Sequence, residues 1–237
     1  MIFIGTSGYN YPEWKGSFYP DDLPTSKMLP YYSERFSTVE INYTFYRFPS
    51  EKALEGWSAA TPEGFTFTLK APRRVTHDAR LKDCHEVTQA FSLRARSLGN
   101  KLGVLFFQLP PSFRVDTDVL DSFLDWVPPD LRVAMEFRHA SWHSEEVFRR
   151  LRSANVAMCI ADSERMTTPV EPTADFGYFR LRDESYKQED IDSWADAIVD
   201  HSPDWKDVFV YFKHEEKGTG PVFVRQLEAS LEARTPA

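Results

Sequence analysis

The sequence contains few cysteines and no long hydrophobic stretch. Its two cysteines, Cys84 and Cys159, give neither the spacing of a metal site nor a disulfide framework, and each is expected to be a small buried hydrophobe. No apolar run approaches the roughly 18 residues of a transmembrane helix. The N-terminus has no signal-like character because Gly5 interrupts its short apolar start. We therefore expect a cytoplasmic protein that does not enter a membrane.

Signatures of common cofactor and catalytic sites are also missing. The segment Gly5-Thr-Ser-Gly8 is too short for a glycine-rich phosphate turn, and no Walker, kinase or GxSxG motif occurs. HxH, HExxH and EF-hand spacings are absent too, so we expect no cofactor. A divalent metal remains an alternative, and its ligands would come from Glu40, His77, Glu136, His139, Asp162 and His214.

Positive charge is in deficit overall, with 28 Lys and Arg against 36 Asp and Glu and a formal net charge of −8. This balance disfavours binding to nucleic acid or to an anionic membrane, although nucleic acid stays an alternative partner. The length of 237 residues suits one α/β barrel, and no linker, repeat or low-complexity tract is visible. We predict a single domain over 1–237. The oligomeric state is left open by the sequence.

Five hydrophobic runs carry polar residues on alternate positions near their C-terminal ends. Side chains alternate between the two faces of a strand, so each run has one apolar face and another that ends in charge. Strands of this kind, separated by helical segments, predict a barrel whose charged strand tips meet at its mouth. The runs are 38–42, 65–70, 133–138, 178–182 and 209–213.

The whole chain alternates strand and helix patterns. This alternation predicts parallel strands with helical crossovers, hence a TIM-type (β/α)8 barrel, with a doubly wound open sheet as the alternative. The stretch between Ala161 and Phe176 predicts only loop, which makes the barrel irregular after strand six. The predicted strands are 2–6, 38–42, 65–70, 103–108, 132–137, 156–161, 176–182 and 208–213. The predicted helices are 27–36, 50–60, 85–98, 117–126, 144–153, 187–200 and 221–233.

The predicted mouth is locally basic on an acidic protein. If the strand tips and the loop after Lys70 converge, they favour a small anionic ligand such as a phosphate or a carboxylate. The alternative is a buried network in which these cations pair with Glu40, Glu136, Asp162 and Asp183. The basic residues are Lys70, Arg73, Arg74, Arg80, Lys82, Arg138, Arg180, Arg182 and Lys213.

Two strand-tip carboxylates and one lysine are the candidates for chemistry. Glu136 shares a face with Arg138, so it should stay ionised and act as a base or nucleophile. Glu40, beside Asn42, is a second carboxylate for an acid/base pair. Lys70 could hold an anion or, with a lowered pKa, form a Schiff base.

The long loop after the first strand is unusually aromatic. Tyr11 and Trp14 in this loop could stack on a sugar or a base, or the loop could simply pack on the barrel rim. With the strand-tip residues, they define two sets of site residues. The predicted catalytic residues are Glu40, Lys70, His77 and Glu136. The predicted substrate-binding residues are Tyr11, Trp14, Asn42, Arg73, Gln108, Arg138, Trp142, Asp162, Arg180, Arg182 and Lys213.

Several motifs in these segments resemble the YecE-like family, domain of unknown function 72. They are Ile4-Gly-Thr-Ser-Gly8, Tyr11-Pro-Glu-Trp14, Phe18-Tyr-Pro20, Thr38-Val-Glu-Ile-Asn-Tyr-Thr-Phe-Tyr46, Lys70-Ala-Pro72, Thr76-His77, Leu102-Gly-Val-Leu-Phe-Phe-Gln-Leu-Pro-Pro111, Glu136-Phe-Arg-His-Ala-Ser-Trp142 and Val208-Phe-Val-Tyr-Phe212. The resemblance spans nearly the whole chain and implies a TIM-type barrel, while the general activity of the family is not established.

The resemblance also implies which positions matter. The family's motif positions map to Glu40, Lys70, His77, Gln108, Glu136, Arg138, Trp142, Asp162 and Arg180. Two positions depart from the family pattern. Arg182-Asp183 stands where relatives usually have histidine-glycine, and Lys213-His214 stands where they usually have asparagines. Both departures add positive charge to the predicted mouth.

Three functional hypotheses follow. The first is an enzyme, a hydrolase, lyase or isomerase, that acts on an anionic phosphorylated or polyhydroxylated small molecule by acid/base chemistry at the C-terminal mouth of the barrel. The second is a base-excision enzyme in which Lys70 forms a Schiff base with an abasic sugar. The third is a non-catalytic binding protein whose mouth charges pair internally.

Overall fold

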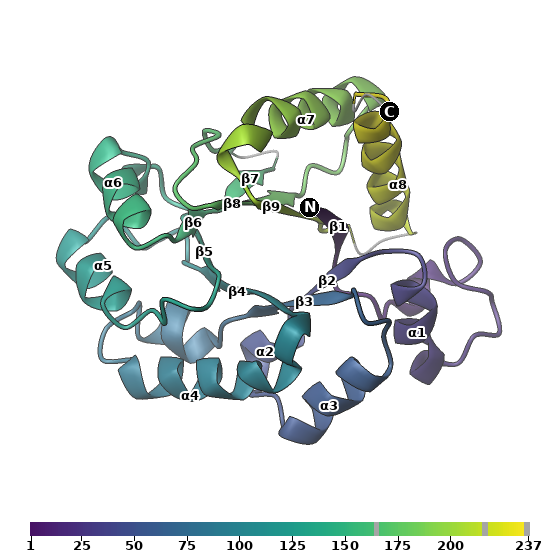
Figure 1. Cartoon of the computed structure of the whole chain (residues 1–237), viewed down its shortest axis with the longest axis horizontal. Coiled ribbons are helices and arrows are strands. Elements are labelled where there is room, and N and C mark those ends of the chain that lie inside the picture. Colours follow the sequence, from purple (N-terminus) through teal and green to yellow (C-terminus); the bar gives the residue numbers. More distant parts are fainter. Residues whose placement is uncertain (164–165, 215–217, 235–237) are drawn as a thin grey trace.

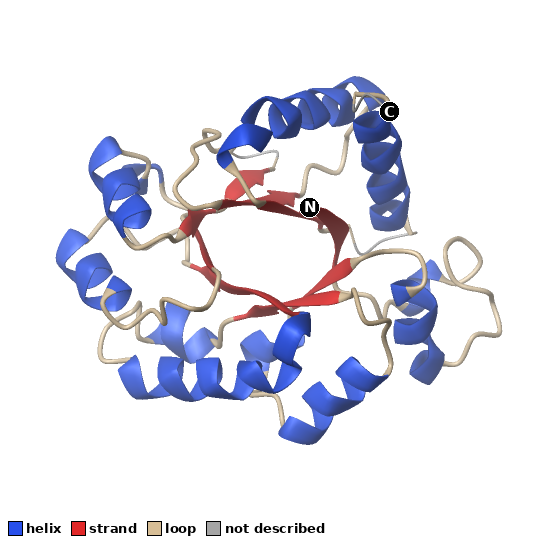
Figure 2. Cartoon of the chain, viewed as in Figure 1, coloured by secondary structure: helices blue, strands red, loops and turns tan. Residues whose placement is uncertain are grey.

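Nine parallel strands form a nearly closed barrel with helices around it (Figures 1 and 2). The computed structural model describes residues 1–163, 166–214 and 218–234. The sheet order is β6-β5-β4-β3-β2-β1-β9-β8-β7, and the β1–β9 pair joins the two ends of the chain. The strands are β1 (Ile2–Ser7), β2 (Thr38–Ile41), β3 (Thr66–Lys70), β4 (Leu102–Gln108), β5 (Val133–Glu136), β6 (Ala157–Met158), β7 (Ile160–Asp162), β8 (Phe176–Leu181) and β9 (Asp207–Phe212). The predicted TIM-type barrel is confirmed.

The predicted sixth strand is broken in two, which corrects the expectation of eight continuous strands. Its first part, β6, pairs with β5, and the Cys159 amide still donates to the Met135 carbonyl at 2.8 Å. Its second part, β7, pairs with β8, with Ile160 opposite Phe179. The chain bends at Cys159 because it must reach two neighbours across the point where the barrel closes. The described residues between β7 and β8 contain no helix, as predicted.

Helices follow most of the strands and cover the outside of the barrel. Serine side chains cap two of them where the sequence predicts a start: Ser50 accepts from the Ala53 amide, and Ser144 from the Val147 amide. The α-helices are α1 (Met28–Ser33), α2 (Tyr43–Tyr46), α3 (Glu51–Ala59), α4 (His85–Ala95), α5 (Thr117–Leu124), α6 (Glu145–Ser153), α7 (Gln188–His201) and α8 (Thr219–Glu232). Short 3₁₀ segments cover Pro12–Trp14, Thr25–Lys27, Arg96–Lys101, Ala140–Trp142 and Ser202–Asp204.

Among the short helical segments that were not predicted, two lie beside the mouth. The α2 turn follows β2 directly, and a π-helical turn spans Arg74–Asp78, where the sequence predicts a loop. Neither is long enough to show a hydrophobic period, which explains why the pattern misses them. Together they bring Phe45 and His77 into contact, with ring centroids 5.0 Å apart.

The interior of the barrel is filled with side chains, and its upper layer is polar. Phe106, Tyr178 and Tyr211 belong to an interior core that is separate from the larger core between barrel and helices. The Tyr211 hydroxyl bonds to Thr38 at 2.7 Å and to Thr68 at 2.8 Å, which satisfies it inside the barrel. The charged strand tips pack directly on this layer. Among the described residues, no helix is long and apolar enough to cross a membrane.

Close strand packing predicts that Gly5→Ala destabilises the protein. A Cβ on Gly5 would lie 2.0 Å from the backbone oxygen of Thr38 on β2. Backbone cannot move aside like the end of a flexible side chain, so we expect a loss of at least about 2 kcal/mol of unfolding free energy in urea denaturation. The matched control is Gly56→Ala on the exposed face of α3, where a Cβ meets nothing within 4 Å. It should stabilise by about 0.5–1 kcal/mol. Equal effects of the two substitutions would contradict the packing at β1–β2.

Candidate functional site at the barrel mouth

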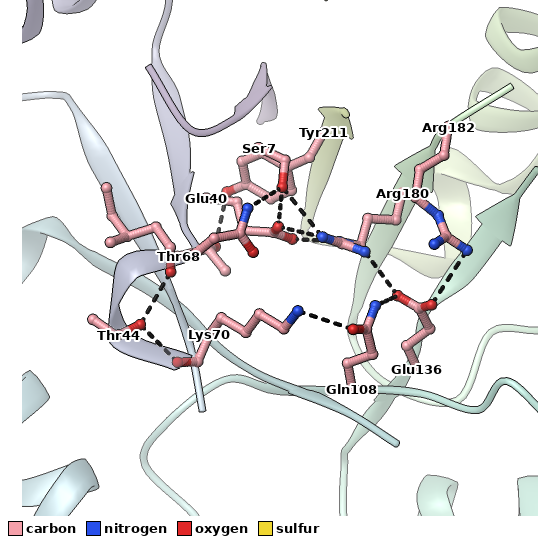
Figure 3. A network of polar contacts seen from close by, with 12 residues as sticks. Ser7, Glu40, Thr44, Thr68, Lys70, Gln108, Glu136, Arg180, Arg182 and Tyr211 are labelled. Atoms are coloured by element: carbon pink, nitrogen blue, oxygen red, sulfur yellow. Dashed lines mark hydrogen bonds and ion pairs between the residues drawn. The ribbon is translucent and has the colours of Figure 1, made fainter. Parts of the chain in front are cut away.

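One buried guanidinium joins the two strand-tip carboxylates (Figure 3). From β8, Arg180 donates to both oxygens of Glu40 on β2, through Nε and Nη2, each at 2.8 Å. Its Nη1 donates to Glu136 Oε2 on β5 at 3.1 Å. All three side chains are at most 1% exposed. Because a single buried charge left unpaired is costly, Arg180 and its two carboxylates form one unit.

Glu40 is held as a carboxylate by donors on every side. The Ser7 hydroxyl donates to Oε1, and the Tyr178 hydroxyl donates to Oε2 at 2.7 Å. Burial alone would raise the pKa of Glu40, but the charge and hydrogen bonds of Arg180 lower it more, so the pKa falls to about 2. Glu40 is therefore ionised at neutral pH and is a weak proton acceptor.

Glu136 is surrounded in the same way. The Gln108 amide donates to Oε2 at 2.8 Å, while Arg182 Nη2 and Arg138 Nε lie 3.4 and 3.6 Å from Oε1. Burial raises the pKa of Glu136, but the nearby Arg180 and Arg182 charges outweigh it, and the net shift is downward. The carboxylate stays ionised, in agreement with the expectation from its arginine neighbour. Glu136 thus serves to pair with the cations around it.

Lys70 is the exception among the mouth cations. Its Nζ donates to the Gln108 side-chain carbonyl at 2.9 Å and lies 4.4 Å from the centre of the Phe45 ring. Among the described residues, no carboxylate forms an ion pair with it. Burial and the Arg180 charge lower the pKa of Lys70 to about 7, although Glu40 and Glu136 oppose that shift. The neutral form of the Lys70 amine is therefore far more accessible near pH 7 than that of an ordinary lysine.

His77 lies on the same side of the mouth. Its ring packs edge-on against Phe45, the ring beneath Lys70, and its Nδ1 is 2.9 Å from the Thr76 hydroxyl. Burial lowers the pKa of His77, and the Lys70 charge lowers it further. His77 is thus a neutral imidazole next to a lysine amine.

Within the described part of the chain, the mouth network contains more cations than carboxylates. Two carboxylates, Glu40 and Glu136, meet four cations, which are Lys70, Arg138, Arg180 and Arg182. The arginines pair with the carboxylates, and Lys70 donates to an amide oxygen. Such an imbalance is relieved by a bound anion or by loss of the Lys70 proton.

Part of the predicted site converges here and part does not. Residues that the sequence analysis did not select also join the network: Ser7 and Tyr178 on Glu40, and Phe45 under Lys70. The alternation of side chains along β1 and β8 could have predicted Ser7 and Tyr178. Phe45 lies in the single turn of α2, which is too short to show a hydrophobic period. The predicted residues that converge are Glu40, Asn42, Lys70, Gln108, Glu136, Arg138, Arg180 and Arg182.

Other predicted binding residues are engaged elsewhere. Trp14 and Trp142 are fully buried, and the Trp142 indole donates to the Phe113 carbonyl at 2.8 Å, so both serve packing rather than contact with substrate. For Trp14, the structure therefore agrees with the alternative prediction that this loop packs on the barrel rim. Arg73 points to solvent and pairs with Asp78 at 3.2 Å. Asp162 accepts from the Tyr186 hydroxyl at 2.7 Å.

Two predicted residues lie at the edge of the network. The positive charge of Lys213 contributes to the lowered pKa of Lys70, which places it near the mouth. The Tyr11 hydroxyl donates to the Ser7 carbonyl at 2.7 Å. The described residues include no group of three His, Cys, Asp or Glu side chains with the arrangement of a metal site. The divalent-metal alternative stays untested.

The fold and this charged mouth define a TIM-type barrel with a polar site at the C-terminal ends of its strands. The family model described as "Protein of unknown function DUF72" matches residues 3–237. The chain belongs to this family, which confirms the resemblance inferred from the motifs.

Named relatives and solved structures agree. The UPF0759 protein YunF of Bacillus subtilis is 26% identical over 92% of this chain and 90% of its own length. The UPF0759 protein YecE of Escherichia coli is 30% identical over 69% of this chain and 60% of its own length. A DUF72 family crystal structure from Thermotoga maritima has a TM-score of 0.85 at 30% identity and covers 98% of this chain and 99% of that one.

A more distant structure shows the fold alone. A glycoside hydrolase family 5 enzyme from Prevotella bryantii, solved in complex with a xyloglucan oligosaccharide, has a TM-score of 0.50 at 9% identity. It covers 97% of this chain and 96% of that one. It supports the TIM-type architecture and says nothing of the chemistry of this chain.

The lowered pKa of Glu40 predicts an acid-sensitive fold. Its folded pKa of about 2 lies below its ordinary value of 4.5, so its stabilisation is complete above that value and is lost as pH falls through this window. The full contribution is about 3 kcal/mol. We expect Glu40→Gln to lower the urea midpoint at pH 7 and to flatten the acid dependence of stability.

The matched control is the exposed ion pair between Arg96 and Asp130. Asp130→Asn also replaces a paired carboxylate by an amide, but in full solvent contact, and should change the midpoint far less than Glu40→Gln. A Glu40→Gln protein with wild-type stability and an unchanged acid profile would show that Glu40 is not the buried partner of Arg180.

Proposed function

We propose that this protein is an enzyme that binds an anionic small molecule at the barrel mouth and uses the Lys70 amine for proton transfer. The observation that supports this proposal is the unequal pairing of the mouth charges. Among the described residues, three arginines pair with two carboxylates, while Lys70 is buried against Phe45 and donates to the Gln108 side-chain carbonyl. A lysine whose pKa is near the working pH is an effective general base.

The roles differ from those expected from the sequence. Glu40 and Glu136 were predicted to transfer protons, but their lowered pKa values make them weak bases. In the proposal, their ion pairs hold the positively charged Arg180 in position at the mouth. Arg138, whose side chain is 35% exposed, is the arginine best placed to meet an incoming anion. His77 packs against the same Phe45 ring as Lys70, and in the proposal it is the neutral group that passes the proton on.

A non-catalytic binding protein is the second candidate. It is favoured by the complete burial of both carboxylates in ion pairs, which is the internal pairing that this hypothesis predicts. It differs from the enzyme proposal in that the mouth charges satisfy one another and Lys70 transfers no proton. The excision hypothesis needs a broad basic surface, and the net charge of −8 counts against one.

The first prediction concerns anion binding. Sulfate is a suitable probe because its charge does not change between about pH 6 and pH 8.5. A bound anion favours the protonated amine, so its affinity should fall as pH rises through the Lys70 pKa of about 7. We expect sulfate to raise the thermal midpoint more at pH 6 than at pH 8.5, and this difference to vanish in Lys70→Met.

A matched pair of variants locates the anion. Arg138→Ala should remove the sulfate effect, whereas Lys206→Ala should keep it. Lys206 pairs with Asp175 at 2.9 Å and precedes β9, at the opposite end of the barrel. General salt stabilisation affects both variants equally. If sulfate stabilises Arg138→Ala as well as the wild type, the mouth is not the anion site.

A second prediction concerns catalysis. Lys70→Arg keeps a positive charge but removes the neutral amine, because arginine does not lose its proton in proteins. Against a panel of phosphorylated sugars followed by NMR, we expect turnover to fall at least about 100-fold in Lys70→Arg, with sulfate stabilisation retained. Near wild-type turnover in this variant would contradict the role of Lys70. If the wild type converts no member of the panel, the binding-protein candidate is favoured instead.

A further inference from the structure

A groove beside the mouth has aromatic walls, and the described residues that line it are all uncharged. It has a volume of about 450 Å³ and lies between the ends of β1 and β2 and the helix α3. A volume of this size is typical of small-molecule sites. The lining residues are Gly8, Tyr9, Asn10, Tyr11, Ile41, Asn42, Tyr43, Tyr46, Ala53 and Trp57.

Two of its aromatic side chains are unusually open to solvent. Tyr43 is 50% exposed and Tyr46 is 80% exposed, while Trp57 is backed by the stacked ring of Phe67 at 6.1 Å. Exposed aromatics that gather in a concave site offer flat apolar faces for stacking. The groove thus differs from the mouth, where the side chains are charged.

Asn42 supplies an unsatisfied polar atom in this lining. Its Nδ2 donates to the Ser7 hydroxyl oxygen at 2.7 Å, and its Oδ1 is buried without a hydrogen-bond partner among the described residues. The amide cannot be turned round. Ser7 has a single hydroxyl hydrogen, which goes to Glu40, and it already accepts from Arg180 Nη2 at 3.2 Å. Asn42 must therefore present its NH₂ group to Ser7 and its oxygen elsewhere.

We infer that this groove binds an uncharged pyranose ring, stacked on the exposed tyrosines, with ring hydroxyls bonded to the amide side chains of Asn10 and Asn42. The unpaired Oδ1 acceptor favours movement of the Asn42 side chain toward a hydroxyl donor, because an unsatisfied buried acceptor costs roughly 1–3 kcal/mol. A sugar ring has apolar C–H faces for the aromatic walls and hydroxyls on its rim for Asn42 and Asn10. Because the described lining of the groove is uncharged, it offers no partner for a charged group of the ligand.

A hydrogen-bond chain connects the groove to the mouth. It runs from Asn42 through Ser7 to Glu40, and from Glu40 to Arg180. We extend the inference to one molecule, a sugar that bears an anionic group, with its ring in the groove and its anion at the mouth. This last step, unlike binding of the ring itself, rests on the proposed function.

Neutral methyl glycosides test the groove without using the anion site. We expect saturation-transfer NMR to detect binding of methyl glucoside, methyl galactoside or methyl mannoside to the wild type. Tyr46→Ala and Asn42→Ala should weaken that binding at least tenfold. The control is Phe48→Ala, which removes a 41% exposed aromatic ring that does not line the groove, and it should bind like the wild type.

The outcomes separate the groove from the mouth. Glycoside binding that survives Arg138→Ala, together with loss of the sulfate effect in that variant, supports two adjoining subsites. Glycoside binding without any sulfate effect supports the groove and overturns the proposed function. Absence of glycoside binding, equal binding by Tyr46→Ala, or binding of adenosine in place of every glycoside overturns the inference.

Discussion

The bidentate pairing of Arg180 with Glu40 is the interaction on which the rest of the mouth depends. The guanidinium is buried over the ring of Phe106, where a lone charge would be prohibitively costly. Its third bond, to Glu136, ties β8 to β5 across the barrel as well as to β2. The positive charge of Arg180 then acts on the other cations of the mouth, including Lys70.

That charge helps to explain the state of Lys70. Both carboxylates nearby are already occupied by arginines, which bind carboxylates in a bidentate manner that an ammonium group cannot match. Lys70 is left with the Gln108 carbonyl and the face of Phe45. The same residue that neutralises the carboxylates thus lowers the pKa of the lysine. Together with burial, the ion pairs account for the lowered pKa of Lys70.

Sequence patterns predicted the barrel and the direction in which its charged tips point, because strand alternation is a local property. Glu40, Glu136 and Arg180 could be selected in this way, and so could Lys70. The pairing could not be predicted, since it depends on which strands face each other across the barrel. For Trp14 the sequence could not distinguish between two roles. An aromatic loop has the same sequence pattern whether its rings contact a substrate or, as here, pack against Tyr19 and Phe18. Phe45 lies in one turn of helix that has no sequence period.

The titration of the Lys70 amine is the measurement that tests this mechanism most directly. NMR of the ¹³Cε resonance, assigned by its disappearance in Lys70→Arg, would follow it in the wild type. A midpoint near pH 7 is expected. A wild-type midpoint near 10.4, the ordinary lysine value, would contradict the claim that the arginines leave Lys70 unpaired.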